Sequence, residues 1–187
     1  MRLFLALELS AGLVQALAAA TEPLRAEAPA LAWVPDDKCH LTLKFLGDVP
    51  DDRLERIVAM CEEVACRQRP VAMQLGGFGA FPNFQRARVV WTGVEHESRL
   101  ELLHHDVENA SGEEGFELGG RAFRPHVTVA RVRTPLWEDE GRRLARVAQA
   151  IDFSATQDVA AISLFESMLA PAGATYRRGH AATLGGR

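Results

Sequence analysis

Apolar positions along the chain follow two periods, one typical of strands and one typical of helices. Alternating or continuous apolar runs predict strands at residues 2–9, 39–46, 71–75, 86–94, 122–132, 159–170 and 175–184. Apolar residues three and four apart predict helices at residues 11–28, 51–65, 98–110 and 136–150. The segment 76–85, which contains glycine and proline, is expected to join two strands. Helices that alternate with strands and strand pairs indicate an α+β fold with mainly antiparallel sheets.

One short pattern occurs twice in the chain. The tetrapeptide His-Leu-Thr-Leu at residues 40–43 recurs about half a chain later as His-Val-Thr-Val at residues 126–129. Residues two apart in an extended strand project from the same face, so each copy places an imidazole beside a hydroxyl while its apolar residues face the core. Two such strands facing each other would surround one small anion with two histidines and two threonines. The spacing also favours two similar lobes.

Composition places the chain among ordinary globular proteins. With 187 residues, 48% of them hydrophobic and 25% charged, it can bury a sizeable core as a single bilobal domain of residues 1–187. No apolar stretch approaches the roughly 20 residues that span a bilayer. The three cysteines, Cys39, Cys61 and Cys66, do not form a disulfide framework. We therefore expect a cytoplasmic monomer with no membrane contact and no protein partner.

The charge balance limits how the chain holds nucleic acid. A formal net charge of −4 and a pI near 5.9 argue against binding long nucleic acid over the whole surface, because such binding needs many phosphate contacts from Lys and Arg. Any such contact should be local. The local basic clusters are Arg86 with Arg88, then Arg121, Arg124, Arg131 and Arg133, and finally Arg177 with Arg178. The commoner alternative for each cluster is ordinary solvated surface.

Two imidazoles on opposite sides of a phosphorus atom meet the needs of in-line phosphoryl transfer. One takes a proton from the attacking water or hydroxyl group, and the other gives a proton to the departing oxygen. The unperturbed histidine pKa of about 6.5 lets one copy be neutral and the other protonated near pH 7. Thr42 and Thr128 can each donate a hydrogen bond to a non-bridging phosphate oxygen. The paired motif thus makes His40 and His126 candidates for an acid-base pair at a phosphate site.

Two competing chemistries fit the sequence less well. A metal site would need a third and a fourth ligand at a recognisable spacing, and the motif supplies a hydroxyl where a carboxylate or thiolate would be expected. A nucleophilic Cys39 is disfavoured because adjacent residues in a strand face opposite ways, so Cys39 points away from the face of His40. Acid-base chemistry by the two histidines remains the leading hypothesis.

Longer segments around both motifs carry a family resemblance. These segments are residues 2–6, 33–35, 40–47, 81–82, 88–93, 123–131 and 163–167, together with Tyr176. They resemble the bacterial and archaeal RNA 2′,3′-cyclic phosphodiesterases, also called 2′-5′ RNA ligases, of the two-histidine phosphoesterase superfamily. The resemblance runs nearly the whole length of the chain, whereas the paired His-x-Thr pattern alone would indicate only the superfamily.

This resemblance implies a bilobal α+β fold, with two mainly antiparallel sheets flanked by helices around a central groove. It implies hydrolysis of a 2′,3′-cyclic phosphate on RNA or a nucleotide to a 2′-phosphomonoester, without a metal or other cofactor. Because the 3′ oxygen must leave, we expect His40 to be the proton donor and His126 the proton acceptor, with Thr42 and Thr128 binding phosphate. Microscopic reversibility would let the same pair join a cyclic phosphate end to a 5′-hydroxyl group.

Three further residues are candidates for contact with a nucleobase or with RNA. Phe45 and Arg131 each lie five residues after a motif histidine, and Arg124 lies just before the second motif. Odd spacing puts Phe45 and Arg131 on the opposite strand face unless the strand twists or ends there, so the alternatives to base stacking are a core position and a surface ion pair. Two other functions stay open: a nucleotide- or RNA-binding module with little turnover, and a phosphodiesterase for another small cyclic phosphate or a 2′-5′ oligonucleotide.

Overall fold

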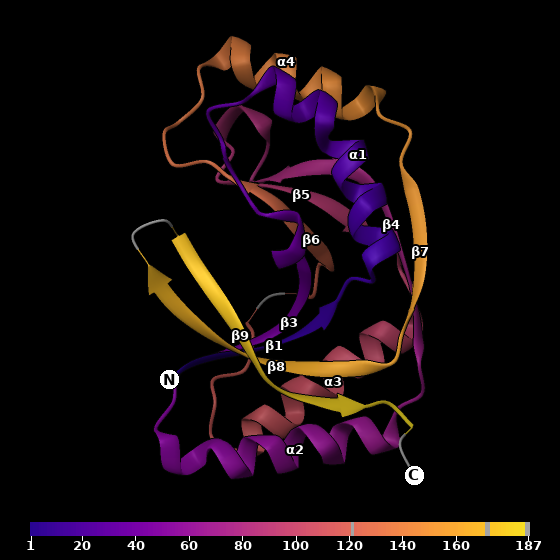
Figure 1. The fold of residues 1–187 in the computed structure, drawn as a ribbon, viewed down its shortest axis with the longest axis vertical. Coiled ribbons are helices and arrows are strands. Elements are labelled where there is room, and N and C mark those ends of the chain that lie inside the picture. Colours follow the sequence, from indigo (N-terminus) through magenta and orange to yellow (C-terminus); the bar gives the residue numbers. More distant parts are fainter. Residues whose placement is uncertain (121, 171–172, 186–187) are drawn as a thin grey trace.

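The computed structural model describes residues 1–120, 122–170 and 173–185, and Figure 1 shows strands between helices at both ends of the molecule. The helices are α1 (Ala11–Glu27), α2 (Leu54–Arg67), α3 (Ser98–Glu113) and α4 (Glu138–Ala150). The strands are β1 (Arg2–Glu8), β2 (Ala32–Trp33), β3 (His40–Asp48), β4 (Val71–Phe81), β5 (Val89–Val94), β6 (His126–Arg131), β7 (Ser154–Val159), β8 (Ala161–Ala170) and β9 (Gly173–Thr183). Short 3-10 helices are η1 (Asp36–Lys38), η2 (Asp51–Arg53) and η3 (Phe84–Arg86).

The strands form one antiparallel sheet, which confirms the α+β class expected from the sequence. Their order is β7-β4-β5-β6-β3-β1-β8-β9, and β2 also pairs with β6. The expectation of two sheets is wrong in this detail, because β3 and β6 pair and join all these strands into one continuous sheet, which we divide into two halves. We call β7-β4-β5-β6 the β6 half and β3-β1-β8-β9 the β3 half. The halves meet where β3 pairs with β6, through Leu41 and Val127.

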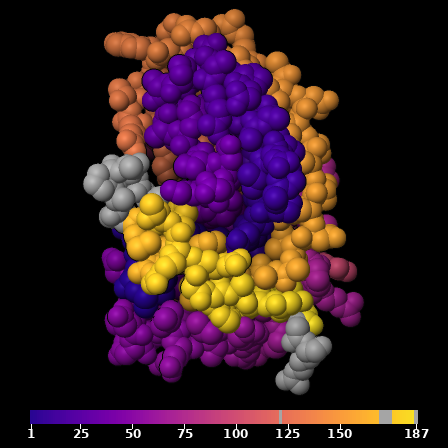
Figure 2. Space-filling model, in the orientation of Figure 1, coloured from indigo at the N-terminus to yellow at the C-terminus, as the bar shows by residue number. Residues whose placement is uncertain are grey.

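Each half of the sheet has its own pair of helices. Helices α1 and α4 pack together at the top of Figure 1, beside the β6 half, whereas α2 and α3 pack together at the bottom, against the β3 half. On the face that Figure 2 shows, α1 covers the upper lobe and β9 crosses the lower lobe above α2. This is the bilobal arrangement expected from the sequence.

Local sequence explains why the first elements form. Residues 3–7 of β1 are all buried, as expected for a strand with a continuous apolar run. The hydroxyl of Ser10 then accepts a hydrogen bond from the Leu13 backbone N–H at 3.2 Å, which caps α1. Leu13, Leu17 and Leu24 lie at helical spacing and are buried in the core. Among the described residues, no helix is both long and apolar enough to span a bilayer.

Besides the two-residue strand β2, which no predicted strand covers, two longer segments differ from the prediction. β7 has no counterpart among the predicted strands, because its outward residues are polar and the inward-facing Ala155 is small, which leaves a weak apolar pattern. The prediction of a joining segment is also wrong over residues 76–81, which continue β4. Gly77 has φ +63° there, and the register against β5 shifts between Gly76 and Phe78. A bulged, glycine-rich strand has the composition of a loop, so the apolar alternation is lost.

Candidate active site

The two motif strands meet at one residue pair, Leu41 of β3 and Val127 of β6. Both side chains are fully buried on the core side of the sheet. In an antiparallel pair, this register places His40 and His126 each opposite the threonine of the other motif, on the face away from the core. We call this side of the sheet the motif face. The sheet therefore brings together the four half-buried side chains that the sequence singles out, which are His40, Thr42, His126 and Thr128.

Each motif strand carries a β-bulge three residues after its histidine. The register of β3 against β1 shifts at Leu43, and the register of β6 against β5 shifts at Val129. In both strands the extra residue and the next one are buried in succession, which breaks the alternation of faces. The residue five positions after each histidine therefore returns to the motif face.

Phe45 and Arg131 occupy this fifth position. Phe45 is 68% exposed, and its ring centroid lies 5.9 Å from that of Phe4, which in turn stacks on His40 at 4.9 Å. Arg131 is exposed and forms no ion pair with another described residue. Burial and then the nearby Arg131 charge lower the pKa of His40, so Arg131 lies close to the first motif. The alternative of a core position for Phe45 is wrong, because the bulge reverses the parity on which it depends.

Both motif histidines are held by the backbone carbonyl two residues earlier in the chain. Nδ1 of His40 lies 2.8 Å from the Lys38 carbonyl oxygen, and Nδ1 of His126 lies 2.7 Å from that of Arg124. A carbonyl oxygen can only accept, so Nδ1 carries a proton and donates it in both rings. Neither Nε2 atom hydrogen-bonds another described residue. The two imidazoles therefore leave the same nitrogen available to take up or release a proton.

Aromatic rings enclose His40. The Phe4 ring stacks on the imidazole with centroids 4.9 Å apart, and Tyr176 of β9 meets it edge-on at 5.3 Å. Phe165 of β8 stacks on Phe4 with centroids 5.3 Å apart. Burial in these surroundings lowers the pKa of His40, although the hydrogen bond to the Lys38 carbonyl opposes the shift. The free protein therefore favours a neutral His40.

The rings beside His126 are steeply inclined to the imidazole rather than stacked on it. Phe81 and Trp91 are both T-shaped to the imidazole, with centroids 5.0 and 6.4 Å away. Trp91 lies across Gly79 of β4, where an added Cβ would come within 2.3 Å of the indole. Only a residue without a side chain leaves room for Trp91 in this place. Gly79 therefore determines how the ring beside His126 is positioned.

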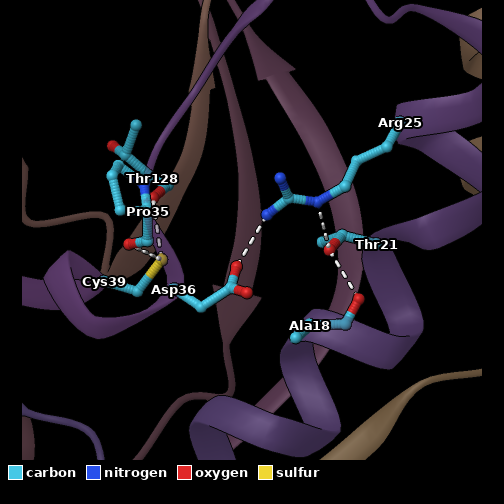
Figure 3. A network of polar contacts seen from close by, with 7 residues as sticks. All are labelled: Ala18, Thr21, Arg25, Pro35, Asp36, Cys39 and Thr128. Carbon is cyan, nitrogen blue, oxygen red and sulfur yellow. Dashed lines mark hydrogen bonds and ion pairs between the residues drawn. The ribbon is translucent and has the colours of Figure 1, made fainter. Parts of the chain in front are cut away.

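The loop before His40 is held from α1. Arg25 donates to the Asp36 carboxylate at 2.7 Å, and its Nε donates to the Thr21 hydroxyl at 3.3 Å (Figure 3). Asp36 begins η1, and η1 ends at Lys38, whose carbonyl orients the imidazole. A chain of polar contacts from the helix thus reaches His40. Contacts of this kind fix ring orientation and tautomer in acid-base sites.

Cys39 lies in the core rather than on the motif face. Its Sγ is 3.8 Å from the carbonyl oxygens of Pro35 and Thr128, beside the contacts of Arg25 in Figure 3. Burial, with the nearby Asp36 charge, raises the pKa of the thiol to about 12. The thiol therefore stays protonated at neutral pH and is a poor nucleophile. Its position instead ties the first motif strand to the second.

The loop that leads toward His126 is held from the β3 half. Lys44, buried behind the first bulge, pairs with Glu108 of α3 at 2.8 Å and donates to the Glu117 carbonyl at 2.5 Å. Burial opposes ionisation of Glu108, but hydrogen bonds from the Gly119 N–H and from Lys44 outweigh it and keep the pKa of the carboxyl below its ordinary value. One buried ion pair therefore connects β3, α3 and this loop.

The segment immediately before β6 also rests on α3. His104 stacks on Phe123 with ring centroids 3.8 Å apart. Burial lowers the pKa of His104, so the stacked ring favours the neutral form. Arg124 follows, with an exposed side chain and a carbonyl that orients His126. Arg121, predicted to belong to the same basic cluster, lies outside the described residues.

Glu8, which pairs with His40 between β1 and β3, is a further titratable group beside the first motif. Across residues 1–120, 122–170 and 173–185, no group of three or more His, Cys, Asp or Glu side chains is arranged to hold a metal ion. Two of the remaining histidines hydrogen-bond carboxylates, His96 with Glu101 and His180 with Glu62. Two arginines form ion pairs, Arg177 with Glu166 and Arg178 with Glu8. The C-terminal basic cluster is therefore ion-paired surface.

Sequence reasoning does not identify the aromatic neighbours of the two histidines. Each of them lies in a segment that carries the family resemblance, which is the one signal that could have found them. Their contacts depend on strand pairing between segments far apart in the chain, and residue spacing cannot reveal such pairing. These neighbours are Phe4, Phe81, Trp91, Phe165 and Tyr176.

Comparison with known proteins gives concordant matches. Residues 13–167 match the family model of the 2′-5′ RNA ligase superfamily. The RNA 2′,3′-cyclic phosphodiesterase of Geobacillus stearothermophilus is 34% identical over 128 residues, which cover 68% of this chain and 41% of that protein. The RNA 2′,3′-cyclic phosphodiesterase of Methanothermobacter thermautotrophicus is 32% identical over 175 residues, which cover 94% of each protein.

Comparison of folds gives the same result. The crystal structure of the Thermus thermophilus protein TT0787 superposes with a TM-score of 0.78 over 100% of this chain and 99% of that chain, at 29% sequence identity. The family match includes both motif strands, so the resemblance noted from the sequence is confirmed. This chain belongs to the 2′-5′ RNA ligase superfamily.

Proposed function

We propose that residues 1–187 act as one bilobal enzyme domain, an RNA 2′,3′-cyclic phosphodiesterase that hydrolyses cyclic phosphate ends of RNA or nucleotides to 2′-phosphomonoesters. The observation that carries the proposal is the pair of His-x-Thr motifs on one face of the sheet, joined at Leu41 and Val127. Neither the Nε2 atoms nor the threonine hydroxyls of the motifs are engaged by another described residue. The relatives named RNA 2′,3′-cyclic phosphodiesterase supply the substrate class.

In this proposal the two histidines move one proton each. Nε2 of His126 accepts a proton from water as the water oxygen bonds to phosphorus. The bond between phosphorus and the 3′ oxygen breaks on the opposite side, and Nε2 of His40 gives its proton to that oxygen. Afterwards His126 releases a proton to solvent and His40 takes one up. The carbonyl contacts at Nδ1 hold both rings in the tautomer that this cycle requires.

The proton-donor role makes substrate binding and protonation of His40 interdependent. Burial lowers the pKa of His40 in the free protein, whereas a proton donor must carry its proton. A bound phosphodiester is an anion, and an opposite charge beside an imidazole favours the protonated form. The anion and the proton therefore favour each other at this site, so the productive complex contains both.

The remaining motif residues have roles in binding. Thr42 and Thr128 donate hydrogen bonds to the non-bridging phosphate oxygens, whose charge grows in the transition state. Phe45 and Arg131, on the motif face at equivalent positions of the two strands, stack on the nucleobase. The exposed Arg124 side chain is a further RNA contact. The proposal needs no metal ion, because these groups supply both the proton transfers and the hydrogen bonds to phosphate.

The first test compares variants of the two histidines. We expect His40→Ala and His126→Ala each to lower turnover of a 2′,3′-cyclic nucleotide by about 10²- to 10⁴-fold without unfolding the protein. The double variant should lose little more than either single one, because the two groups act as a unit. His96→Ala, an exposed histidine paired with Glu101, is the matched control and should keep wild-type turnover.

The same assay identifies the product and the need for metal. A 2′-phosphomonoester, formed equally well with EDTA present, is the expected result. Full activity in either motif variant, or a 3′-phosphomonoester as the product, would contradict the proposal. Tight nucleotide binding without any product would instead indicate a binding module.

A second test assigns the two roles. A proton donor is inactive once it loses its proton, so it produces the fall in rate at high pH, and a proton acceptor produces the fall at low pH. The residual activity of His40→Ala should therefore rise with pH and then level off. That of His126→Ala should be level at low pH and then fall. The opposite pair of profiles would exchange the roles of His40 and His126.

The family name supports a joining activity at the same site. A 5′-hydroxyl group of RNA can take the place of the attacking water, with His126 accepting its proton and His40 again giving a proton to the 3′ oxygen. We therefore expect slow joining of an RNA that has a cyclic phosphate end to an RNA that has a 5′-hydroxyl end. Product of ligated length that disappears in His126→Ala is the expected result.

A further inference from the structure

Four arginines at one end of β5 and β6 have no carboxylate partner among the described residues. Arginines elsewhere commonly have one, and these ion-paired residues are Arg25, Arg53, Arg56, Arg67, Arg142, Arg143, Arg177 and Arg178. No described carboxylate lies within ion-pair distance of the exposed Arg86, Arg88, Arg131 and Arg133. The same is true of Arg2, Arg69, Arg99, Arg124 and Arg146, but the first four arginines lie together at the ends of two paired strands. Like charges held together repel, so a group of this kind favours the arrival of an anion.

A cleft of about 500 Å³ lies at this end of the two strands. The turn that leads into α4, at the upper left of Figure 1, forms part of its wall. The cleft combines basic and apolar groups, and its lining residues are Gln85, Arg86, Ala87, Arg88, Val132, Arg133, Pro135 and Leu136. Its volume is within the range of sites that bind small molecules.

Backbone contacts fix the walls of the cleft. The Val132 N–H donates to the Arg88 carbonyl at 2.9 Å, which joins the two strand ends. Gly141 of α4 packs so closely on η3 that an added Cβ would lie 2.7 Å from the Phe84 carbonyl oxygen. The wall formed by η3 therefore packs against α4, so the backbone that carries the arginines is held in place.

The cleft lies at the strand ends just beyond Arg131. Arg131 pairs with Val89 at the end of β6, and the next residues outward in the two strands, Val132 and Arg88, line the cleft. Successive residues of a strand rise only about 3.3 Å, so the cleft begins beside Arg131. Arg131 is also close enough to the first motif to contribute, after burial, to the lowered pKa of His40. Exposed arginines therefore extend from Arg131 to the strand ends that line the cleft.

We infer that this cleft binds backbone phosphates of the nucleotides on the 5′ side of the cyclic phosphate, so that the preferred substrate is the end of an RNA chain rather than a cyclic mononucleotide. The inference rests on the proposed function. A nucleotide with a 2′,3′-cyclic phosphate is joined to the rest of its chain only through its 5′ side. Guanidinium groups bind phosphate through paired N–H donors. The net charge of −4 confines such contact to a local basic strip.

The test compares two substrates and two matched variants. The substrates are a 2′,3′-cyclic mononucleotide and a pentanucleotide that ends in the same cyclic nucleotide. The cleft variant carries Arg86→Gln, Arg88→Gln and Arg133→Gln. The control variant carries the same change of charge at three exposed arginines outside the cleft, which are Arg69→Gln, Arg99→Gln and Arg146→Gln.

We expect wild type and the control variant to have a higher kcat/KM for the pentanucleotide than for the mononucleotide. In the cleft variant, kcat/KM for the pentanucleotide should fall about tenfold or more, whereas kcat/KM for the mononucleotide should stay within about twofold of wild type. The pentanucleotide rate of this variant should also depend less on salt, because each lost phosphate contact reduces counterion release. The mononucleotide rate shows that the cleft variant is folded.

Three results would overturn the inference while leaving the proposed function intact: equal wild-type use of the two substrates, an unchanged pentanucleotide rate in the cleft variant, or an equal loss in the control variant. If wild type turned over neither substrate, the proposed function would fail instead. The cleft would then be tested by binding a 3′-phosphorylated pentanucleotide to both variants. Weaker binding by the cleft variant alone would keep it as an RNA-phosphate site, and equal binding would reject it.

Discussion

The two motif strands share one backbone arrangement and differ in what surrounds it. In β3 and β6 alike, a carbonyl two residues back orients the histidine, and a bulge returns the fifth residue to the motif face. The Phe4 ring stacks on His40, whereas Phe81 and Trp91 are T-shaped to His126. The backbone therefore places the two imidazoles, and side chains from neighbouring strands determine the surroundings in which each one works.

The core side of the two strands differs more sharply. The residue four positions after the histidine is buried in both, but it is Lys44 in β3 and Ala130 in β6. Lys44 requires Glu108 as a partner, whereas Ala130 requires none. The β6 half depends instead on Gly79, because the Trp91 indole occupies the space that a side chain would fill there. One half thus depends on a buried ion pair and the other on the absence of a side chain.

Breaking the ion pair should have the largest effect on stability. We expect Lys44→Met to lower the free energy of unfolding by about 2–4 kcal/mol, because the partly buried Glu108 carboxylate would lose its cation. Urea titration followed by far-UV circular dichroism measures the change. The double variant Lys44→Met/Glu108→Leu should recover much of the loss, since it leaves no unpaired charge. A loss below about 1 kcal/mol in the single variant would show that the β3 half does not depend on this pair.

Adding a methyl group at Gly79 should disturb the β6 half. We expect Gly79→Ala to cost about 1–3 kcal/mol of unfolding free energy and to lower kcat, because its Cβ would displace Trp91 from beside His126. Thermal unfolding and initial rates on a 2′,3′-cyclic nucleotide measure both effects. Gly12→Ala is the control: no atom outside its own helix lies within 4 Å of the added Cβ, so rate and stability should be kept. Wild-type stability and turnover in Gly79→Ala would show that the position of Trp91 does not affect the site.

Substitutions at the fifth position should have smaller effects, mainly on KM. We expect Phe45→Ala and Arg131→Ala each to raise KM for a cyclic nucleotide about tenfold with less change in kcat, because stacking on a base contributes about 1–3 kcal/mol. Leu102→Ala, at another exposed apolar residue, should change neither constant. Non-additive effects in the Phe45→Ala/Arg131→Ala double variant would indicate that both groups contact the same base. An unchanged KM in both single variants would exclude them from base binding.

The pH dependence of stability should show the smallest effect. Burial lowers the pKa values of His40 and His104 from the ordinary value of 6.5 in the folded protein. The unfolded chain therefore binds more protons as the pH falls below about 6.5, and stability present above that pH is progressively lost. Unfolding free energies at pH 8 and pH 5.5 should differ less in His40→Gln than in wild type, and least in His40→Gln/His104→Gln. An identical pH dependence in all three proteins would contradict the burial of these rings.

The parts of the site that local geometry determines could be predicted from the sequence. Residues two apart in a strand share a face, so the pairing of His40 with Thr42 and of His126 with Thr128 follows from spacing alone. The helices were predictable for a similar reason, since Ser10 and the apolar spacing after it act within a few turns. Because adjacent residues of a strand face opposite ways, the sequence also predicted that the Cys39 thiol points away from the motif face.

The parts that depend on strand pairing could not be predicted. A bulge is a property of two strands together, and neither Leu43 nor Val129 differs in kind from the apolar residues around it, so the faces of Phe45 and Arg131 could not be settled. The same holds for Lys44, whose charge suggests a surface position until Glu108 is found behind it. Polar and glycine-rich strands such as β7 and the end of β4 were missed because their stability comes from hydrogen bonds to neighbouring strands rather than from apolar alternation.

The pairing of Leu41 with Val127 has a mechanical consequence. If the two halves of the sheet rock against each other, the rotation passes through this junction, because here β3 joins β6. Points near a rotation axis move least, and the two histidines flank the axis, whereas α2 and α4 lie far from it at opposite ends of Figure 1. A rotation of this kind would therefore leave the spacing of the imidazoles nearly unchanged.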